Sequence, residues 1–228
     1  MLILGHRAQD KIIPGRFGVE LDVRSNWNGW LTLCHDPVTT GTSALLMDDW
    51  IRMDADANGR LRPLYALNVK EDDIEQQILD CLYRHGIVDR SFVFDMSYPS
   101  FRKFRDLGVQ VAERISEEEF FQERSEILWV DRWNWDQPIR YGRHLPPPGY
   151  KIDGDYIWIP HFSQNKNVIA YVISPELHIE IASHAVKLYW TDFHKMHLDG
   201  ICTDRWDECE EWLNGMEGKD DFDSKKEG

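Results

Sequence analysis

The sequence predicts an α/β fold, namely a (β/α)8 TIM barrel made by a single domain. Its length, 228 residues, suits one barrel domain with a substantial core. Short apolar runs alternate along the chain with amphipathic helical stretches, which is the pattern of a parallel sheet covered by helices. Several apolar runs end on histidine, lysine or acidic residues, and such strand ends form the active-site face of a barrel.

Three apolar runs open the chain, at residues 2–4, 19–23 and 31–34. In the second run, apolar residues alternate with charged ones, with the period of two that is typical of a strand. We interpret all three runs as strands. Each run contains, or is followed by, residues that can act in catalysis or bind a metal ion.

The connection over residues 37–63 has weak periodicity, and we interpret it as a loop. Its Asp54-x-Asp56-x-Asn58-Gly59 resembles the start of an EF-hand calcium loop. The glutamate that such a loop requires at its twelfth position is replaced by Tyr65, so we do not expect an EF-hand here.

Repeated strand and helix units follow. Gly86 and Gly108 end the first two expected helices, Ser97 and Pro99 begin the second, and Ser116-x-x-Glu119 is a capping box for the third. The expected strand and helix pairs are 64–70 with 72–85, 92–95 with 97–107, and 109–112 with the helix that the capping box begins.

The last barrel strands are expected at 127–130, 168–173 and 200–202, as the sixth, seventh and eighth of the barrel. A segment rich in proline and tryptophan, 132–164, interrupts the rhythm as a loop insertion after the sixth strand. We therefore predict one barrel domain over 1–213. Residues 214–228 are polar and charged and are expected to form a disordered acidic tail.

Composition narrows the classes of function. The formal net charge of −14 argues against a nucleic-acid partner, because phosphate backbones are bound by clustered lysine and arginine. No apolar run approaches the length of a transmembrane segment, and no signal peptide precedes the first strand. The four cysteines lack a Cys-x-x-Cys spacing and suit a reducing compartment, so we expect a cytoplasmic protein.

The reactive residues of the first three runs form a set suited to phosphodiester cleavage. Glu20 and Asp22 are two apart on one strand and point the same way, so they can hold one divalent metal ion, Mg²⁺ or Ca²⁺. His6 and His35 suit general acid and base catalysis because histidine titrates near neutral pH. Arg7 can neutralise the phosphate in the transition state.

These motifs resemble the signature of the glycerophosphodiester phosphodiesterases, within the phosphatidylinositol phospholipase C-like superfamily. The resemblance rests on order and spacing, and it covers most of residues 1–205. Its lean barrel is similar to a branch of uncharacterised bacterial proteins. The motifs are Gly5-His6-Arg7, Val19-Glu20-Leu21-Asp22-Val23, His35-Asp36-Pro37, Leu67-Asn68-Val69-Lys70 and Asp199-Gly200-Ile201-Cys202-Thr203-Asp204.

The resemblance implies a metal-dependent phosphodiesterase acting on a small glycerophosphodiester-like or sugar-linked phosphodiester. In such enzymes a neighbouring hydroxyl attacks phosphorus, one histidine acts as base and the other as acid, and Arg7 and Lys70 neutralise the phosphate. The family usually has a glutamate where this chain has Asn68, whose amide oxygen can ligate a cation without adding charge. Asp95, after the fourth barrel strand, either supplies the missing carboxylate or caps the turn before Pro99.

Two alternatives to this function remain open. The first is a catalytically impaired barrel that binds a phosphate-containing ligand, and Asn68 motivates it. The second is a glycoside hydrolase using Glu20 and Asp22, which fits less well because two carboxylates on one strand face do not flank a bond from opposite sides. Glu176 and Asp204 also follow barrel strands; they either line the mouth, hold an arginine or cap a helix.

Overall fold

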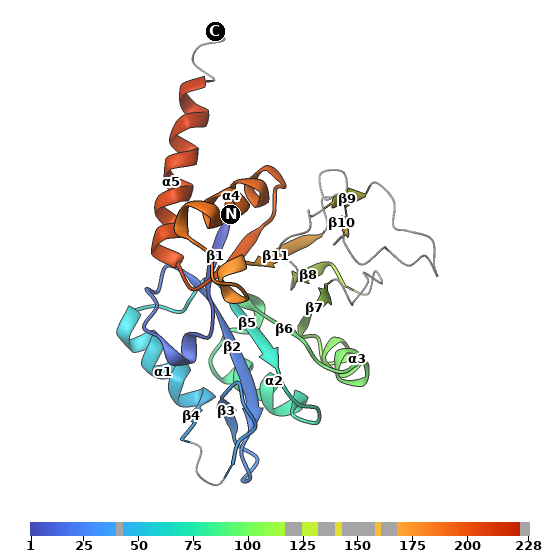
Figure 1. Ribbon diagram of the computed structural model, residues 1–228. Helices are drawn as coiled ribbons and strands as arrows, with labels where there is room; N and C mark the ends of the chain where they lie inside the picture. Colours follow the sequence, from blue (N-terminus) through green and yellow to red (C-terminus); the bar gives the residue numbers. More distant parts are fainter. Residues whose placement is uncertain (40–42, 117–124, 132–139, 143–157, 161–167, 224–228) are drawn as a thin grey trace.

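The computed structural model describes residues 1–39, 43–116, 125–131, 140–142, 158–160 and 168–223, and these ranges form a closed parallel barrel covered by helices (Figure 1). Eight parallel strands make the barrel, which confirms the predicted fold class. In their order around the barrel they are β1 (Leu2–Gly5), β12 (Gly200–Thr203), β11 (Ile169–Ile173), β8 (Ile127–Val130), β7 (Gln110–Ile115), β6 (Ser91–Phe94), β5 (Tyr65–Val69) and β2 (Gly18–Ser25).

Strand β1 closes the barrel because it pairs with β12 on one side and with β2 on the other. Leu2 lies opposite Gly200, and Leu4 lies opposite Gly18. A Cβ atom on Gly200 would lie 2.9 Å from the Leu2 carbonyl oxygen and 2.6 Å from the Tyr171 ring. Glycine at this position therefore permits the close approach of the strands at the seam.

A short hairpin extends the sheet beyond the barrel. Strand β3 (Leu31–Leu33) runs antiparallel to β2, and β4 (Leu45–Leu46) runs antiparallel to β3. The run at 31–34 is thus a strand, as predicted, but it lies outside the ring of parallel strands. It brings the residues that follow it back beside the end of β2, where the Cys34 amide donates to the Asp22 carbonyl over 3.0 Å.

The helices lie outside the barrel strands. Helices α2 and α3 confirm the predicted strand and helix units, and the Ser97 hydroxyl accepts a hydrogen bond from the Ser100 amide as the expected N-cap. The helices are α1 (Met47–Asn58), α2 (Glu75–Arg84), α3 (Tyr98–Asp106), α4 (Ser183–Lys195) and α5 (Trp206–Asp223), with 3₁₀ turns η1 (Ala8–Asp10), η2 (Val88–Arg90) and η3 (Pro175–Leu177).

The interpretation of residues 37–63 as a loop is wrong, because this segment contains β4 and α1. Met47, Trp50 and Ile51 are buried at helical spacing, so one short apolar face is enough to dock the helix. The aspartates at positions 48, 49, 54 and 56 interrupt the apolar pattern, so the helical periodicity is weak in the sequence. The EF-hand-like residues form the last turn of α1, which Gly59 ends at φ 64°.

Helix α5 continues through residues 214–223, so this part of the expected disordered tail is helical, and the domain boundary at 213 stays a prediction. The helix expected after Ser116, and most of the insertion 132–164, lie outside the described residues. Within the insertion, β9 (Arg140–Gly142) pairs in parallel with β10 (Trp158–Pro160). No helix in the described ranges is long and apolar enough to span a membrane.

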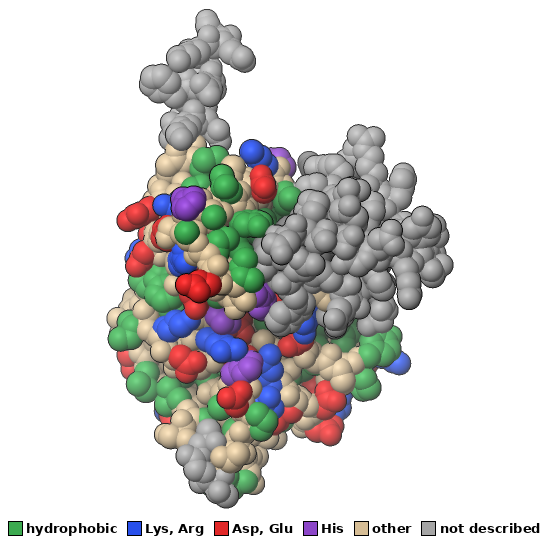
Figure 2. All heavy atoms as spheres, in the orientation of Figure 1, with side chains coloured by type: hydrophobic (Ala, Val, Ile, Leu, Met, Phe, Trp, Pro, Cys, Tyr) green, Lys and Arg blue, Asp and Glu red, His purple; other side chains and the backbone are tan. Residues whose placement is uncertain are grey.

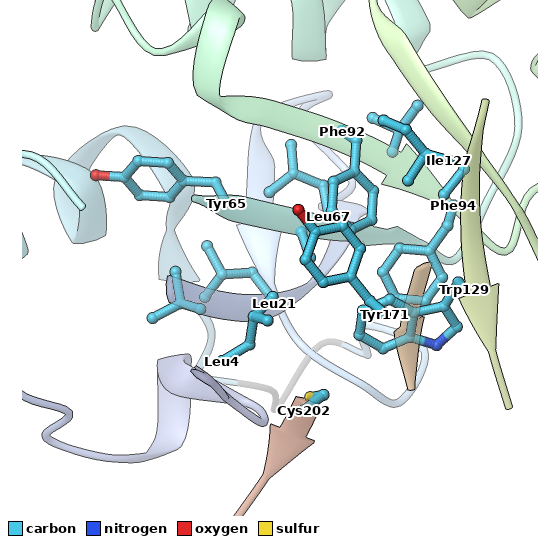
Figure 3. Packing of buried hydrophobic residues seen from close by; sticks show 14 of the residues in the cluster. Leu4, Leu21, Tyr65, Leu67, Phe92, Phe94, Ile127, Trp129, Tyr171 and Cys202 are labelled. Atoms are coloured by element: carbon cyan, nitrogen blue, oxygen red, sulfur yellow. The ribbon is translucent and has the colours of Figure 1, made fainter. Parts of the chain in front are cut away.

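The barrel interior is packed with aromatic rings that meet across it (Figure 3). Phe92 stacks on Tyr171 with ring centroids 5.2 Å apart, and Phe94 stacks on Trp129 at 4.2 Å. These rings come from β6, β8 and β11, so each stacked pair joins strands that are not neighbours in the sheet. They fill the barrel below the polar residues at the strand ends, so that the interior is a core rather than a channel.

A buried arginine ties α1 to the start of β2 and β5. Arg62 is 1% exposed, and its guanidinium pairs with Asp54 of α1. The same guanidinium donates to the backbone carbonyls of Ile13 at 2.7 Å and Pro14 at 3.0 Å. With a further hydrogen bond to the Phe17 carbonyl at 3.3 Å, one side chain therefore satisfies a mostly buried carboxylate and three backbone carbonyls.

We predict that Arg62→Ala destabilises the fold by about 3–5 kcal/mol, because it leaves Asp54 and the backbone carbonyls buried without their partner. Urea denaturation followed by circular dichroism measures this change. Arg60→Ala, at an exposed position two residues away, is the control and should stay within about 0.5 kcal/mol. Equal stability of the two variants would contradict the role assigned to Arg62.

Candidate active site

Two buried carboxylates lie on the inner face of β2. Glu20 is 2% exposed and Asp22 is 1% exposed. Parallel pairing places Asp22 opposite Asn68 of β5, and Asn68 opposite Phe94 of β6. Paired residues on neighbouring strands point to the same face of the sheet, so Asn68 lies in the same row as Asp22, at the carboxyl ends of the strands.

Asn68 presents an amide oxygen that lacks a partner. Its Oδ1 atom is buried and accepts no hydrogen bond from the described residues, and the Oε1 atom of Gln9 is in the same condition. Gln9 nevertheless donates from Nε2 to the Asp22 carboxylate over 3.2 Å. Buried polar atoms are usually paired, so these oxygens indicate an occupant that the described residues do not supply.

Glu20 is held in a setting that opposes its ionisation. Burial raises the pKa of Glu20, and the nearby charge of Asp22 raises it further. Its Oε2 atom accepts a hydrogen bond from the backbone amide of Arg7 over 2.9 Å. Arg7 adopts the left-handed conformation, with φ 47°, which costs energy for a residue with a side chain and turns its amide toward the carboxylate.

Asp22, in contrast, is surrounded by cations. The Nε atom of Arg7 and the Nζ atom of Lys70 each lie 3.5 Å from its carboxylate oxygens. The structure therefore brings together Arg7, Glu20, Asp22, Asn68 and Lys70, five of the site residues expected from the sequence. Strands β1, β2 and β5 position them.

His6, just after β1, is held by a carboxylate from the last barrel strand. Its Nδ1 atom lies 3.1 Å from Oδ1 of Asp204, which also accepts a hydrogen bond from Lys11. Burial opposes ionisation of Asp204, but the hydrogen bonds from His6 and Lys11 outweigh it and lower its pKa. Of the alternatives for Asp204, the structure selects a place at the mouth beside His6.

His35 follows the β3 strand and is 45% exposed. Its Nδ1 atom lies 2.9 Å from Asp36, and this hydrogen bond lowers the pKa of Asp36, with smaller contributions from Arg7 and Arg24. Arg24 donates to the backbone carbonyls of His35 and Lys70, each over 3.1 Å. Arg24, which the sequence analysis does not single out, therefore ties the His35 segment to the end of β5.

Asp95 is engaged by two cations. Its Oδ2 atom accepts from Lys70 over 3.1 Å, and its Oδ1 atom pairs with Arg114 of β7. Ser97 caps α3 instead, so the capping role considered for Asp95 belongs to its neighbour. Asp95 has φ 67°, a second strained residue at the mouth.

The ion pairs that begin with Lys70 and Asp95 continue through Arg114 to residues that the sequence did not predict for the site. Arg114 lies 3.2 Å from Asp131, and Asp131 lies 3.0 Å from Nε2 of His178. The sequence analysis does not single out Arg114, Asp131 or His178. Asp131 directly follows β8, and its place at a strand end is the signal that points to this pair.

Glu176, in the η3 turn after β11, contacts the end of β12. Its carboxylate accepts hydrogen bonds from the hydroxyls of Ser174 and Thr203, and from the Asp204 amide over 3.3 Å. Glu176 therefore holds the end of β12, and with it the carboxylate that contacts His6.

The donor set fits a hard divalent cation. Glu20, Asp22 and Asn68 offer oxygen atoms only, which suit Mg²⁺ and Ca²⁺, and the amide oxygen is unpaired. Figure 2 shows histidine, lysine or arginine, and acidic side chains gathered at the centre of one face of the molecule. The arrangement can hold a cation and a phosphate together, and His6 lies at the same mouth and can transfer a proton.

We predict that Glu20→Gln raises the melting temperature of the metal-free protein by a few degrees at pH 8, because it removes a buried charge. The folded-state pKa of Glu20 lies above its ordinary value of 4.5, so stability falls as pH rises from 4.5 through the folded value. The gain of the variant should vanish near pH 4. Melting curves in chelator test this, with exposed Glu180→Gln as the control. A variant less stable than wild type at pH 8 would refute the prediction.

Comparison with known proteins relates this fold to solved structures. No protein-family model matches the sequence, and no curated protein matches it significantly. A glycerophosphodiester phosphodiesterase from Parabacteroides distasonis is similar in structure, with a TM-score of 0.61 and 13% identity over 94% of this chain and 97% of its own.

Two further glycerophosphodiester phosphodiesterases are similar. That of Agrobacterium tumefaciens has a TM-score of 0.57 and 15% identity, over 91% of this chain and 98% of its own. That of Thermotoga maritima has a TM-score of 0.54 and 14% identity, over 93% and 97%. At these identities the likeness establishes the fold: this chain has the TIM-barrel architecture of glycerophosphodiester phosphodiesterase structures along most of its length.

Proposed function

We propose that the protein is a metal-dependent phosphodiesterase that hydrolyses a glycerophosphodiester-like or sugar-linked phosphodiester by histidine acid/base catalysis. The observation that carries the proposal is the buried Glu20 and Asp22 pair with the unpartnered amide oxygen of Asn68 in the same row. The similar barrels are named as glycerophosphodiester phosphodiesterases, which supports the same reaction class. Substrate would enter at the carboxyl ends of the strands.

Glu20, Asp22 and Asn68 would hold the cation, Mg²⁺ or Ca²⁺. When bound, such a cation polarises a phosphoryl oxygen and offsets the negative charge that grows on it. Arg7 and Lys70 bind the remaining phosphate oxygens, since both already lie 3.5 Å from the Asp22 carboxylate and carry donors at the mouth. Together they orient the diester for in-line attack.

His6 acts as the general base. With Asp204 accepting from Nδ1, the proton is kept on that nitrogen, and Nε2 keeps its lone pair. Nε2 then takes the proton of the attacking hydroxyl, from a neighbouring group of the substrate or from water. His35, more exposed and backed by Asp36, donates a proton to the leaving oxygen.

Asp95 has two possible roles in this scheme. As a fourth ligand it would supply the carboxylate that Asn68 does not. Its contacts with Lys70 and Arg114 favour the other role, in which it positions Lys70 for the phosphate.

A catalytically impaired barrel that binds a phosphate-containing ligand is the second candidate. The observation that favours it is that Arg7 and Lys70 already neutralise Asp22, so this carboxylate is paired without a metal ion. Such a protein would bind a phosphate ester at the same mouth without turnover.

We predict turnover of bis(p-nitrophenyl) phosphate and glycerophosphocholine with added Mg²⁺, Ca²⁺ or Mn²⁺, and none in chelator. His6→Ala and His35→Ala should each lower kcat by about 10²–10⁴-fold, the contribution of a positioned acid or base. His184→Ala, exposed on α4, is the matched control and should keep full activity.

If no metal and substrate gave turnover but the protein bound a phosphate ester, the enzyme proposal would be wrong and the phosphate-binding barrel would be supported. Wild-type turnover in His35→Ala would show that His35 is not catalytic. The role of His6 would then be judged from His6→Ala alone.

Metal binding gives a separate prediction. Mg²⁺ or Ca²⁺ should raise the melting temperature of the wild type, and Glu20→Gln should abolish this rise because it removes a charged ligand. Asn68→Asp should tighten metal affinity at least about tenfold by adding a carboxylate. Thermal melting with and without metal measures the first effect and isothermal titration calorimetry the second. Unchanged affinity in Asn68→Asp would exclude residue 68 from the metal site.

Asp95→Asn separates the two roles of Asp95 in the same titration. Unchanged metal affinity with weaker substrate binding identifies the residue that positions Lys70, whereas lost metal affinity identifies a ligand.

A further inference from the structure

Three side chains on the outer helices form a group of potential metal ligands away from the barrel mouth. They are Asp48 in the first turn of α1, Cys81 in the last turn of α2, and His85 at the end of α2. Their ligand atoms, one oxygen, one sulfur and one nitrogen, all lie within 4.8 Å of one another. We propose that this cluster is a binding site for a zinc ion.

The backbone sets the geometry of the cluster. The His85 amide donates to the Cys81 carbonyl over 3.1 Å, so the two residues are one helical turn apart and their side chains share a face. Asp48 approaches this face from the other helix, and its Oδ1 atom lies 2.7 Å from Nε2 of His85. Two helices that are distant along the chain therefore present three ligands to one point.

The ligand chemistry selects zinc over the cations expected at the mouth. Sulfur and imidazole ligands suit zinc, whereas Mg²⁺ and Ca²⁺ prefer oxygen ligands throughout. Zinc bonds of about 2.0–2.3 Å place tetrahedral ligand atoms roughly 3.5 Å apart, so small side-chain movements complete the site. Water would occupy the fourth position.

Arg84 pairs with the Asp48 carboxylate of the metal-free cluster. Zinc binds cysteine as the thiolate, so the Cys81 thiol would release its proton to solvent when the ion binds. Arg84 contacts the two Asp48 oxygens at 2.5 and 2.6 Å and thereby competes with the ion. The Asp48 side chain is 29% exposed, so solvent can reach the cluster from its side, whereas Cys81 is buried.

Bound zinc would fasten α1 to α2. Because the ligands are far apart in the unfolded chain, the ion binds the folded state in preference and stabilises it. At zinc 100 times its Kd, the melting temperature should rise by roughly 5–10 °C.

Cobalt substitution tests the proposal with a readout that requires a thiolate. The metal-stripped full chain is titrated with Co²⁺, and a thiolate-to-cobalt charge-transfer band should appear with one equivalent and disappear when Zn²⁺ is added. Cys81→Ser should remove the band. Cys34→Ser is the matched control, and Glu20→Gln, which alters the mouth, should also keep the band, which separates this site from the proposed catalytic metal.

Other variants keep the proposal testable if the buried Cys81→Ser does not fold by circular dichroism. His85→Gln and Asp48→Asn should each weaken zinc affinity at least about tenfold in a chromophoric chelator competition. Arg84→Ala should strengthen it, because it frees the Asp48 carboxylate. A wild type without the band, a band that survives in Cys81→Ser, or zinc affinity unchanged in both His85→Gln and Asp48→Asn would overturn the proposal.

Discussion

Closure of the barrel by β1 is the constraint on which the rest of the site depends. Because β1 pairs with both β12 and β2, the residues that follow it lie between the ends of these two strands. His6 therefore meets Asp204 on one side, and the Arg7 amide meets Glu20 on the other. A sheet left open at this seam would separate the proposed base from the carboxylate that orients it. The close strand approach at Gly200 is thus part of the chemistry as well as of the fold.

The interior is divided into an aromatic part and a polar part, and this division explains the electrostatics of the mouth. Phe94, which stacks on Trp129, lies in the same row as Asp22 and Asn68, so the aromatic packing directly borders the polar side chains. Carboxylates at this boundary lose solvation, which is why the pKa of Glu20 rises. A cation bound as proposed would offset the energetic cost of these charges, so the burial that raises the pKa of Glu20 would also favour the proposed metal.

Arginine and lysine side chains lie among carboxylates at the mouth of this acidic protein. The chain carries a formal charge of −14, yet Arg7, Lys70 and Arg114 lie among the strand ends. Each is paired with a carboxylate, so an arriving phosphate would exchange partners with groups that are already oriented. The same local arrangement serves either a phosphodiesterase or a phosphate-binding barrel, and proton transfer at His6 and His35 is what distinguishes them.

The sequence by itself determined the fold class and the barrel strands, because strand periodicity is a local signal, and it predicted the residue set from His6 to Lys70 from polar residues at strand ends. It did not reveal α1, whose acidic residues mask a short apolar face, nor the helical part of the segment after residue 213. Tertiary structure alone decided which partners these residues have. The Asp204 contact with His6, the Lys70 and Arg114 contacts of Asp95, and the unpaired oxygen of Asn68 depend on strand register and closure, which bring together residues up to 198 positions apart. Such contacts have no local signature, since they arise from the order of strands around the barrel.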